Sequence, residues 1–166
     1  MKRLLTIFLA LAMLFSLSIS AFASDSAAQN TQGTYTVVVD GKTLELNDLP
    51  VPPYSAETTI MVPLRIIGEA LGYTVGWDAE SGAITLDDNC IQKAILYDGT
   101  AKVVFEGKLK VIDLSREIEN AVQTVIHNGY TYVPLEFFQE FFNDTAVDGN
   151  TITIAPSKSE LHNESK

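Results

Sequence analysis

The alternation of hydrophobic and polar residues changes to a helical period in one short segment, which begins at Pro63 and ends at Gly72. Proline suits the first position of a helix because its missing N–H is not needed there, and glycine suits the left-handed residue that ends a helix. The pattern predicts one short amphipathic helix. Its apolar side is formed by Leu64, Ile66, Ile67, Ala70 and Leu71, and its polar side by Arg65, Gly68 and Glu69.

Strand-like alternation surrounds this helix and predicts several β-hairpins. Residues 37–39 precede Asp40-Gly41, and residues 125–127 precede Asn128-Gly129. Both dipeptides are typical of two-residue hairpin turns. Further strands are expected at 59–62, 75–77, 83–86, 91–97, 103–105, 109–112, 145–147 and 151–154. The connection 113–123 has room for one or two additional helical turns.

The helix signal occurs again near the C-terminus, where Val133-Pro134-Leu135 precedes four phenylalanines: Phe137, Phe138, Phe141 and Phe142. Matching residues are 66 apart at the hairpins and 71 apart at the helices, so five extra residues lie in the connection 113–123. We therefore predict an α+β fold class with two repeated units, 35–89 and 90–154, each mostly antiparallel β-hairpins packed on one short helix. Because units this small bury little alone, the two are expected to share a core or to pack side by side.

The two ends of the chain differ in composition from the part between them. Lys2 and Arg3 precede the apolar run 4–21, and Ala21-Phe22-Ala23 matches a cleavage site. Residues 1–23 are therefore predicted to be a secretory signal peptide, which makes the mature protein secreted or extracellular at the cell surface. The apolar run is also long enough for an uncleaved membrane anchor, which is the alternative. Residues 24–34 are expected to be a flexible leader and 155–166 a disordered tail.

The mature protein is strongly acidic. Cleavage near Ala23 lowers the number of basic residues from 11 to 9 against 21 acidic residues, which gives a net charge of −12. Polyanions are repelled by such a protein, since their binding needs Lys and Arg to neutralise phosphates. We therefore expect no nucleic acid and no anionic membrane surface among its partners.

Four segments resemble a known family. They are Val-Val-Val-Asp-Gly-Lys at 37–42, Leu-Pro-Val-Pro-Pro-Tyr at 49–54, the run 59–78 and Ala-Ile-Thr-Leu at 83–86. These segments are similar to the copper amine oxidase N-terminal-like domain, a family of secreted or surface proteins, mostly of Gram-positive bacteria, with units in tandem. The resemblance covers 35–154 and is looser in the second copy, where Glu136 replaces Arg65, Asn143 replaces Gly72 and the Trp-Asp pair is missing. It implies a non-catalytic module.

Amine oxidation itself is excluded by the residues present. A copper amine oxidase site needs three histidines and a tyrosine within Asn-Tyr-Asp or Asn-Tyr-Glu, whereas this chain has only His127 and His162 and no Asn-Tyr pair. Cys90 with His127 is the candidate pair for a thiol enzyme, and Asp87-Asp88 for a carboxylate hydrolase or a calcium site. Neither has the spacing of such a site, and Cys90 is expected to be buried at the start of a strand. We expect no catalytic residue, no metal and no cofactor.

Five residues are candidates for ligand contact: Trp77, Arg65, Tyr54, Phe137 and Phe141. Trp77 and Arg65 have no counterpart in the second unit, although Trp77 is expected to be at least half buried against the helix. Tyr54 offers a ring on which a sugar or a peptide can stack. Phe137 and Phe141 either join the two units or form an exposed contact patch.

The function expected from these features is that of a secreted, non-catalytic binding or accessory module. It would act at the bacterial cell envelope on cell-wall glycan or on a surface protein. The alternatives are a structural spacer or oligomerising surface protein, and a cryptic hydrolase.

Overall fold

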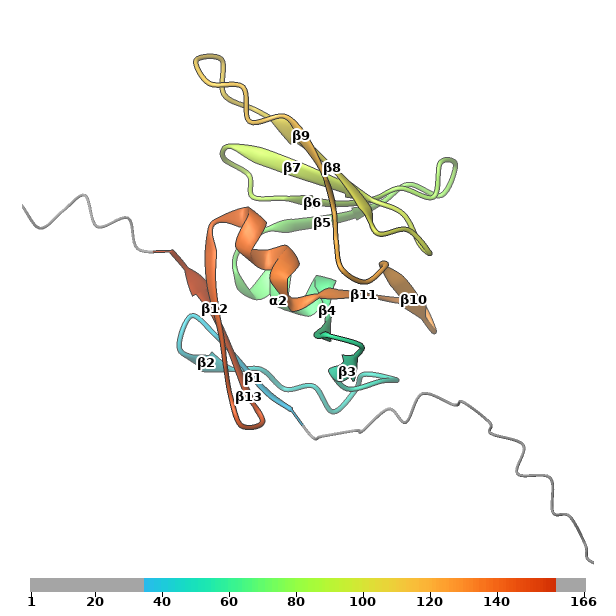
Figure 1. The fold of residues 1–166 in the computed structure, drawn as a ribbon, viewed down its shortest axis with the longest axis vertical. Coiled ribbons are helices and arrows are strands. Elements are labelled where there is room, and N and C mark those ends of the chain that lie inside the picture. The colour runs from blue at the N-terminus through green and yellow to red at the C-terminus, as the bar shows by residue number, and fades with distance from the viewer. Residues whose placement is uncertain (1–34, 158–166) are drawn as a thin grey trace, which may run out of the picture.

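Residues 35–157 are described by the computed structural model, and they form three β-sheets around two short helices (Figure 1). This part of the protein is mostly β-strand with a small helical part, consistent with the α+β class. The predicted signal peptide 1–23 lies outside the described residues, as do the leader 24–34 and most of the tail. Within residues 35–157, no helix is long and apolar enough to cross a membrane.

The strands are short, and each helix directly follows a strand that ends in proline, at Pro63 and at Pro134. In chain order the elements are β1 (Thr36–Val39), β2 (Lys42–Thr43), β3 (Tyr54–Ala56), β4 (Thr59–Pro63), the helix α2 (Leu64–Ala70), β5 (Thr74–Trp77), β6 (Ile84–Asp87), β7 (Gln92–Leu96), β8 (Lys102–Gly107), β9 (Arg116–Glu119), β10 (Val125–His127), β11 (Tyr130–Pro134), the 3₁₀ helix η1 (Leu135–Phe141), β12 (Asn143–Asp148) and β13 (Thr151–Pro156).

Every sheet combines strands from before and after residue 90. The strand orders are β12-β13-β1-β2, β10-β11-β4-β3 and β5-β6-β7-β8-β9. The two halves of the chain pair in parallel at β1 and β13, and antiparallel at β4 and β11 and at β6 and β7. The halves therefore do not form separate sheets that only touch at their surfaces.

Local turn chemistry agrees with the sequence. Asp40-Gly41 connects β1 to β2, and Asn128-Gly129 connects β10 to β11 with positive φ at both residues. Gly72 follows α2 with φ of 82°, as predicted for the residue that ends the helix. Pro63 lies one position earlier than predicted, because it is the last residue of β4 and α2 begins at Leu64.

The second helix ends differently from the prediction that matched Asn143 to Gly72. Phe142 is the left-handed residue, with φ of 56°, and Asn143 is buried. The Asn143 amide nitrogen donates to the carbonyl oxygens of Phe138 at 2.9 Å and Phe141 at 3.2 Å. The last carbonyls of η1 are thus satisfied by the Asn143 side chain together with the backbone N–H of the left-handed Phe142.

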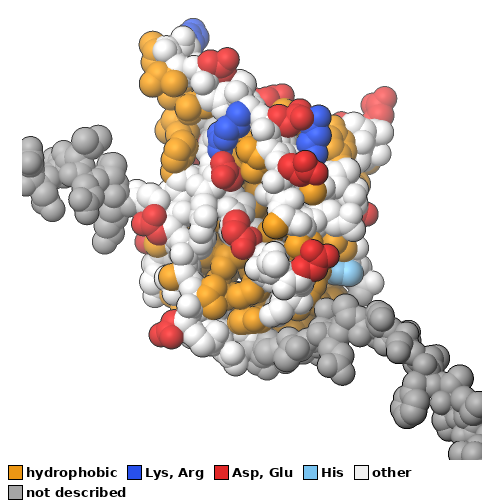
Figure 2. Space-filling view, in the orientation of Figure 1, with side chains coloured by type: hydrophobic (Ala, Val, Ile, Leu, Met, Phe, Trp, Pro, Cys, Tyr) orange, Lys and Arg blue, Asp and Glu red, His pale blue; other side chains and the backbone are white. Residues whose placement is uncertain are grey.

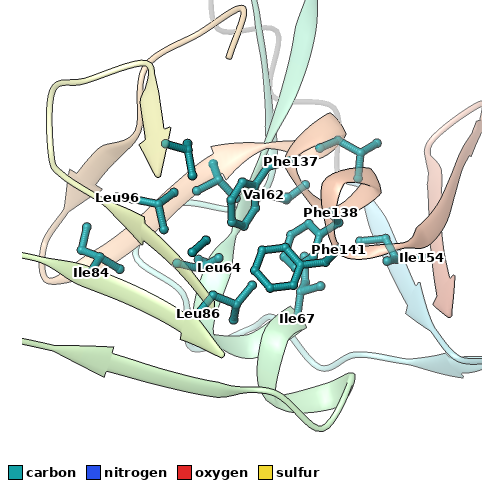
Figure 3. Packing of buried hydrophobic residues seen from close by; sticks show 14 of the residues in the cluster. Val62, Leu64, Ile67, Ile84, Leu86, Leu96, Phe137, Phe138, Phe141 and Ile154 are labelled. Atoms are coloured by element: carbon teal, nitrogen blue, oxygen red, sulfur yellow. The ribbon is translucent and has the colours of Figure 1, made fainter. Parts of the chain in front are cut away.

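One continuous core contains residues from all three sheets and both helices. Figure 3 shows Leu64 and Ile67 of α2 facing the phenylalanines of η1, with Leu86 and Leu96 of the third sheet on one side and Ile154 on the other. The two halves therefore share a core, which is one of the two arrangements expected from the sequence.

The connection from β8 to β9 departs most from the predicted pattern. β8 extends from Lys102 through Gly107, beyond the expected 103–105, and the strand expected at 109–112 does not form. No additional helix forms in 113–123, where β9 pairs with β8 instead. β13 extends to Pro156, two residues into the predicted tail, because Ala155 and Pro156 pair with β12.

Candidate functional site

Trp77 lies at the end of β5, the edge strand of the third sheet, and 54% of its surface is exposed. The prediction that it is at least half buried against the helix is wrong. α2 begins at Leu64, and its first turn already reaches Val75, whose carbonyl accepts a hydrogen bond from Arg65. Since a strand rises about 3.3 Å per residue, Trp77 extends past the start of the helix.

Arg65 fixes the position of β5 against α2. Its Nη1 donates to Glu69 Oε1 at 3.3 Å and to the carbonyl oxygen of Val75 at 3.2 Å. About half of the Arg65 side chain is exposed, and a guanidinium carries five N–H donors. The residue is therefore both a support for the strand and a charged donor at the surface.

The β10–β11 hairpin completes a groove with Arg65 and Trp77. The groove has a volume of about 560 Å³, and Tyr130, which follows the Asn128-Gly129 turn and is 36% exposed, lies in its wall. Its lining consists of Pro63, Arg65, Ile66, Val75, Gly76, Trp77, Ile84, Ile126, Gly129, Tyr130 and Thr131. Residues 63–84 come from the first half of the chain and 126–131 from the second, so both halves are needed to form the groove.

The lining is suited to binding rather than to acid–base or nucleophilic chemistry. It offers aliphatic side chains, two aromatic rings and one guanidinium, but no carboxylate, imidazole or thiol. Hydrolysis needs a positioned acid, base or nucleophile. Aromatic faces beside polar donors are instead typical of sites that bind sugars or peptides.

Gly76 is a partly buried residue of the groove wall, where β5 presents its backbone without a side chain. A Cβ at this position would lie 2.5 Å from Thr85 Oγ1 on the neighbouring strand β6, which is closer than side chains tolerate. A larger residue would therefore force either the Thr85 side chain or β5, with the Trp77 that follows it, to move.

Three of the five predicted contact residues lie away from the groove and are buried. Tyr54 packs on Tyr132, and its hydroxyl lies 3.3 Å from His127 Nε2. Phe137 and Phe141 belong to the core, where both rings pack against Phe105 of β8. Phe141 also packs on Tyr73 of the first half, with 5.7 Å between the ring centroids. Both phenylalanines therefore belong to the core shared by the two halves and do not form an exposed patch.

Tyr130 and Ile126 are groove residues that were not selected from the sequence. Tyr130 has the same stacking capacity as Tyr54, and the signal that the sequence offers is its place directly after the Asn-Gly turn, where a side chain stays accessible. The place of Ile126 in the groove could not be predicted, because the alternation of apolar and polar residues along a strand does not show which of its two faces borders a cavity.

A second, smaller groove of about 390 Å³ lies at the matching place with the halves exchanged, between the β3–β4 hairpin of the first half and the start of η1 in the second. Its residues Ser55, Thr58, Thr59 and Ile60 each lie 71 positions before Ile126, Gly129, Tyr130 and Thr131 of the first groove. Glu136 stands where the first groove has Arg65, and its carboxylate accepts a hydrogen bond from the Thr59 hydroxyl. No tryptophan lines it, so only the first groove combines a cation with large exposed aromatics.

The residues considered for catalysis or metal binding are not assembled into a site. Cys90 is exposed, contrary to the prediction, because the Asp88 carboxylate accepts the N–H groups of Cys90, Ile91 and Gln92 and turns the chain outward there. Within residues 35–157, no group of three His, Cys, Asp or Glu side chains could hold a metal.

Asp87 forms an ion pair with Lys108. Its Oδ1 lies 2.7 Å from Lys108 Nζ. Burial alone would raise the pKa of Asp87, but the hydrogen bonds from Lys108 and from the N–H of Asn89 outweigh it and hold this pKa below its usual range. Asp87 is thus a structural carboxylate at physiological pH.

The chain is similar to a known protein family and to a curated bacterial protein. The sequence profile described as "Copper amine oxidase N-terminal domain" matches residues 38–155. A protein of Brevibacillus choshinensis named "Protease inhibitor" is 26% identical over 106 residues, which are 63% of this chain and 30% of that protein. The chain therefore corresponds to under a third of that relative's length. No solved structure matches the chain.

Proposed function

Because the chain belongs to the copper amine oxidase N-terminal domain family, we propose that it is a secreted, non-catalytic module that binds cell-envelope glycan in the groove between its halves. The observation that carries this proposal is the pairing of exposed Trp77 and Tyr130 with Arg65 around one open groove. Secretion rests on the predicted signal peptide, which lies outside the described residues.

The groove chemistry favours a largely neutral glycan. Sugar rings present apolar faces that stack on aromatic side chains, and their hydroxyls accept hydrogen bonds from a guanidinium. Arg65 can also hold a single carboxylate, such as those that peptidoglycan carries. A mature charge of −12, from 9 basic and 21 acidic residues, disfavours polyanionic wall polymers.

The two halves are proposed to be related units, 35–89 and 90–154, each with hairpins packed on one helix. The matching positions of the two grooves support this, since their hairpin residues keep a constant separation of 71. In this view each groove lies between the first turn of one unit's helix and a hairpin of the other unit. The two grooves are equivalent by position, and only the first has kept side chains suited to binding a ligand.

A protein partner is the second candidate function. The relative named "Protease inhibitor" favours it, because a protein with that name acts by binding another protein. An oligomerising spacer has less support, since Phe137 and Phe141, the two residues of its expected contact patch, are buried.

Sedimentation of the purified mature chain, Ser24–Lys166, with insoluble peptidoglycan tests the proposal. Trp77→Ala is expected to weaken binding about tenfold, because a stacked aromatic contributes about 0.5–1.5 kcal/mol beyond the burial of its area, and 1.4 kcal/mol is a factor of ten. Tyr97→Ala is the matched control, since Tyr97 is a 41% exposed aromatic outside the groove. If Trp77→Ala binds as tightly as wild type, the groove is not the glycan site.

A further inference from the structure

The connection between β8 and β9 forms a projecting loop, which we call the finger and define as Lys108–Asp113. All six of its residues are exposed. Figure 1 shows it extending beyond the third sheet, and Figure 2 shows hydrophobic side chains along the same projection. Val111 is 87% and Ile112 57% exposed, and with Leu109 they supply three of the eight exposed large hydrophobic side chains of the described chain.

The base of the finger is closed by hydrogen bonds on both sides. The N–H of Lys108 donates to the Ile91 carbonyl at 2.7 Å, and the N–H of Gly107 donates to Ser115 Oγ at 3.1 Å. The N–H of Ser115 donates in turn to Asp113 Oδ1 at 2.9 Å. The two sides of the base also lie close together, since a Cβ on Gly107 would lie 2.7 Å from the Leu114 nitrogen.

Arg116 anchors the base to the core. Its guanidinium donates to the Glu140 carbonyl at 2.8 Å and to Gln92 Oε1 at 3.0 Å, and it stacks on the Phe105 ring at 4.0 Å. Gln92 is fully buried and donates to the same Glu140 carbonyl at 3.0 Å. The base of the finger is therefore fixed to the core, which removes part of the entropic cost of binding a partner.

The side chains at the tip of the finger do not pack in the core of the domain. Leu109, Val111 and Ile112 belong to neither core cluster of the described residues. Lys108 is held by Asp87, whereas Lys110 makes no ion pair within residues 35–157. The tip thus presents, between aliphatic residues, one ammonium without an ion pair in the described chain, on an exposed loop whose base is fixed.

We propose that the finger enters the substrate cleft of a serine endopeptidase with an acidic primary pocket, with Lys110 in that pocket and its aliphatic neighbours along the cleft. An endopeptidase cleft binds a short exposed segment and places one side chain in a specificity pocket, which in trypsin holds a carboxylate. Complexes of this kind form between pre-organised surfaces with little backbone movement. This inference rests on the second candidate function, a protein partner, and is independent of glycan binding at the groove.

Inhibition of trypsin by the purified mature chain tests the proposal, with hydrolysis of a chromogenic lysine or arginine substrate as the readout. Wild type is expected to inhibit competitively, and Lys110→Ala at least tenfold more weakly. Lys42→Ala is the matched control, because Lys42 is an exposed lysine on the distant strand β2 and its variant is expected to inhibit as wild type does. Trp77→Ala is also expected to inhibit normally, which separates the finger from the groove.

Four results would overturn the proposal: no inhibition by wild type, equal inhibition by Lys110→Ala, loss of inhibition in Trp77→Ala, or rapid hydrolysis after Lys110 that ends the inhibition. Val111→Asp adds a check by sedimentation velocity. If wild type is a dimer and this variant a monomer, the tip contacts a second copy of the chain and not a protease.

Discussion

At the scale of single residues, Gly68 shows how the core constrains the helix beside the groove. The sequence places Gly68 on the polar side of α2, yet it is buried between the helix and the third sheet. A Cβ there would lie 2.7 Å from Leu86 Cδ1 and 3.2 Å from Val75 Cγ2. The glycine thus allows α2 and β5, which both line the groove, to approach closely.

Gly68→Ala is accordingly expected to lower the free energy of unfolding by about 1–3 kcal/mol, because overpacking exceeds the roughly 1 kcal/mol that alanine gains over glycine in a helix. Urea denaturation followed by circular dichroism measures this change. Glu69→Ala, at the next and exposed position, should change it by less than about 1 kcal/mol, since only an exposed ion pair with Arg65 is lost. A Gly68→Ala variant as stable as wild type would show that the helix does not need this close approach.

The ligand-contact residues predicted from the sequence are partly correct. Arg65 and Trp77 both line the groove, and they were selected because no equivalent exists in the second half. Phe137 and Phe141 were selected for lack of an obvious burial site, but the sequence does not show that η1 packs against both α2 and β8. Burial on two sides of a helix depends on the assembly of distant strands.

At the scale of elements, the end of η1 depends on one buried amide. Asn143 donates to the carbonyls of Phe138 and Phe141 and accepts the Tyr73 hydroxyl at 3.0 Å. Tyr73 follows α2, so this contact joins the end of the first helix to the end of the second. Burial raises the pKa of Tyr73, while its hydrogen bond to Asn143 opposes that rise.

Asn143→Ala is expected to lower the free energy of unfolding by about 2–4 kcal/mol, because it leaves buried polar groups without partners. The melting temperature should fall clearly in differential scanning calorimetry. Asn47→Ala makes the same chemical change at an exposed asparagine and should stay within about 0.5 kcal/mol of wild type. Equal melting temperatures for both variants would mean that the amide does not hold η1.

Elements that depend on the residues within them could be predicted from the sequence. Elements that depend on contacts with distant parts of the chain could not. The Asp40-Gly41 and Asn128-Gly129 turns follow from residues that tolerate positive φ. The left-handed Phe142 instead goes with a tertiary feature, the buried Asn143 side chain that bonds the carbonyls of the preceding helix. The finger was predicted as a strand because its aliphatic residues alternate with polar ones, and alternation alone does not show whether a partner strand is present.

At the scale of the whole molecule, the two halves depend on each other. Each sheet contains strands from both, and the groove takes Trp77 from one half and Tyr130 from the other. The pairing of β1 with β13 could not be predicted, because alternating residues define the faces of a strand but not its neighbour. A binding site made from both halves exists only when the whole domain is folded.

Trp77 is the single tryptophan of the chain, so its fluorescence reports directly on the proposed groove. Titration with soluble peptidoglycan fragments should give a saturable shift of the emission maximum to shorter wavelength, as the indole leaves water. Tyr130→Ala should need about tenfold more glycan for the same shift, by the same stacking contribution of about 0.5–1.5 kcal/mol beyond area burial, while Tyr97→Ala should follow wild type. An emission spectrum that does not change at glycan concentrations sufficient for sedimentation with the wall would contradict binding in the groove.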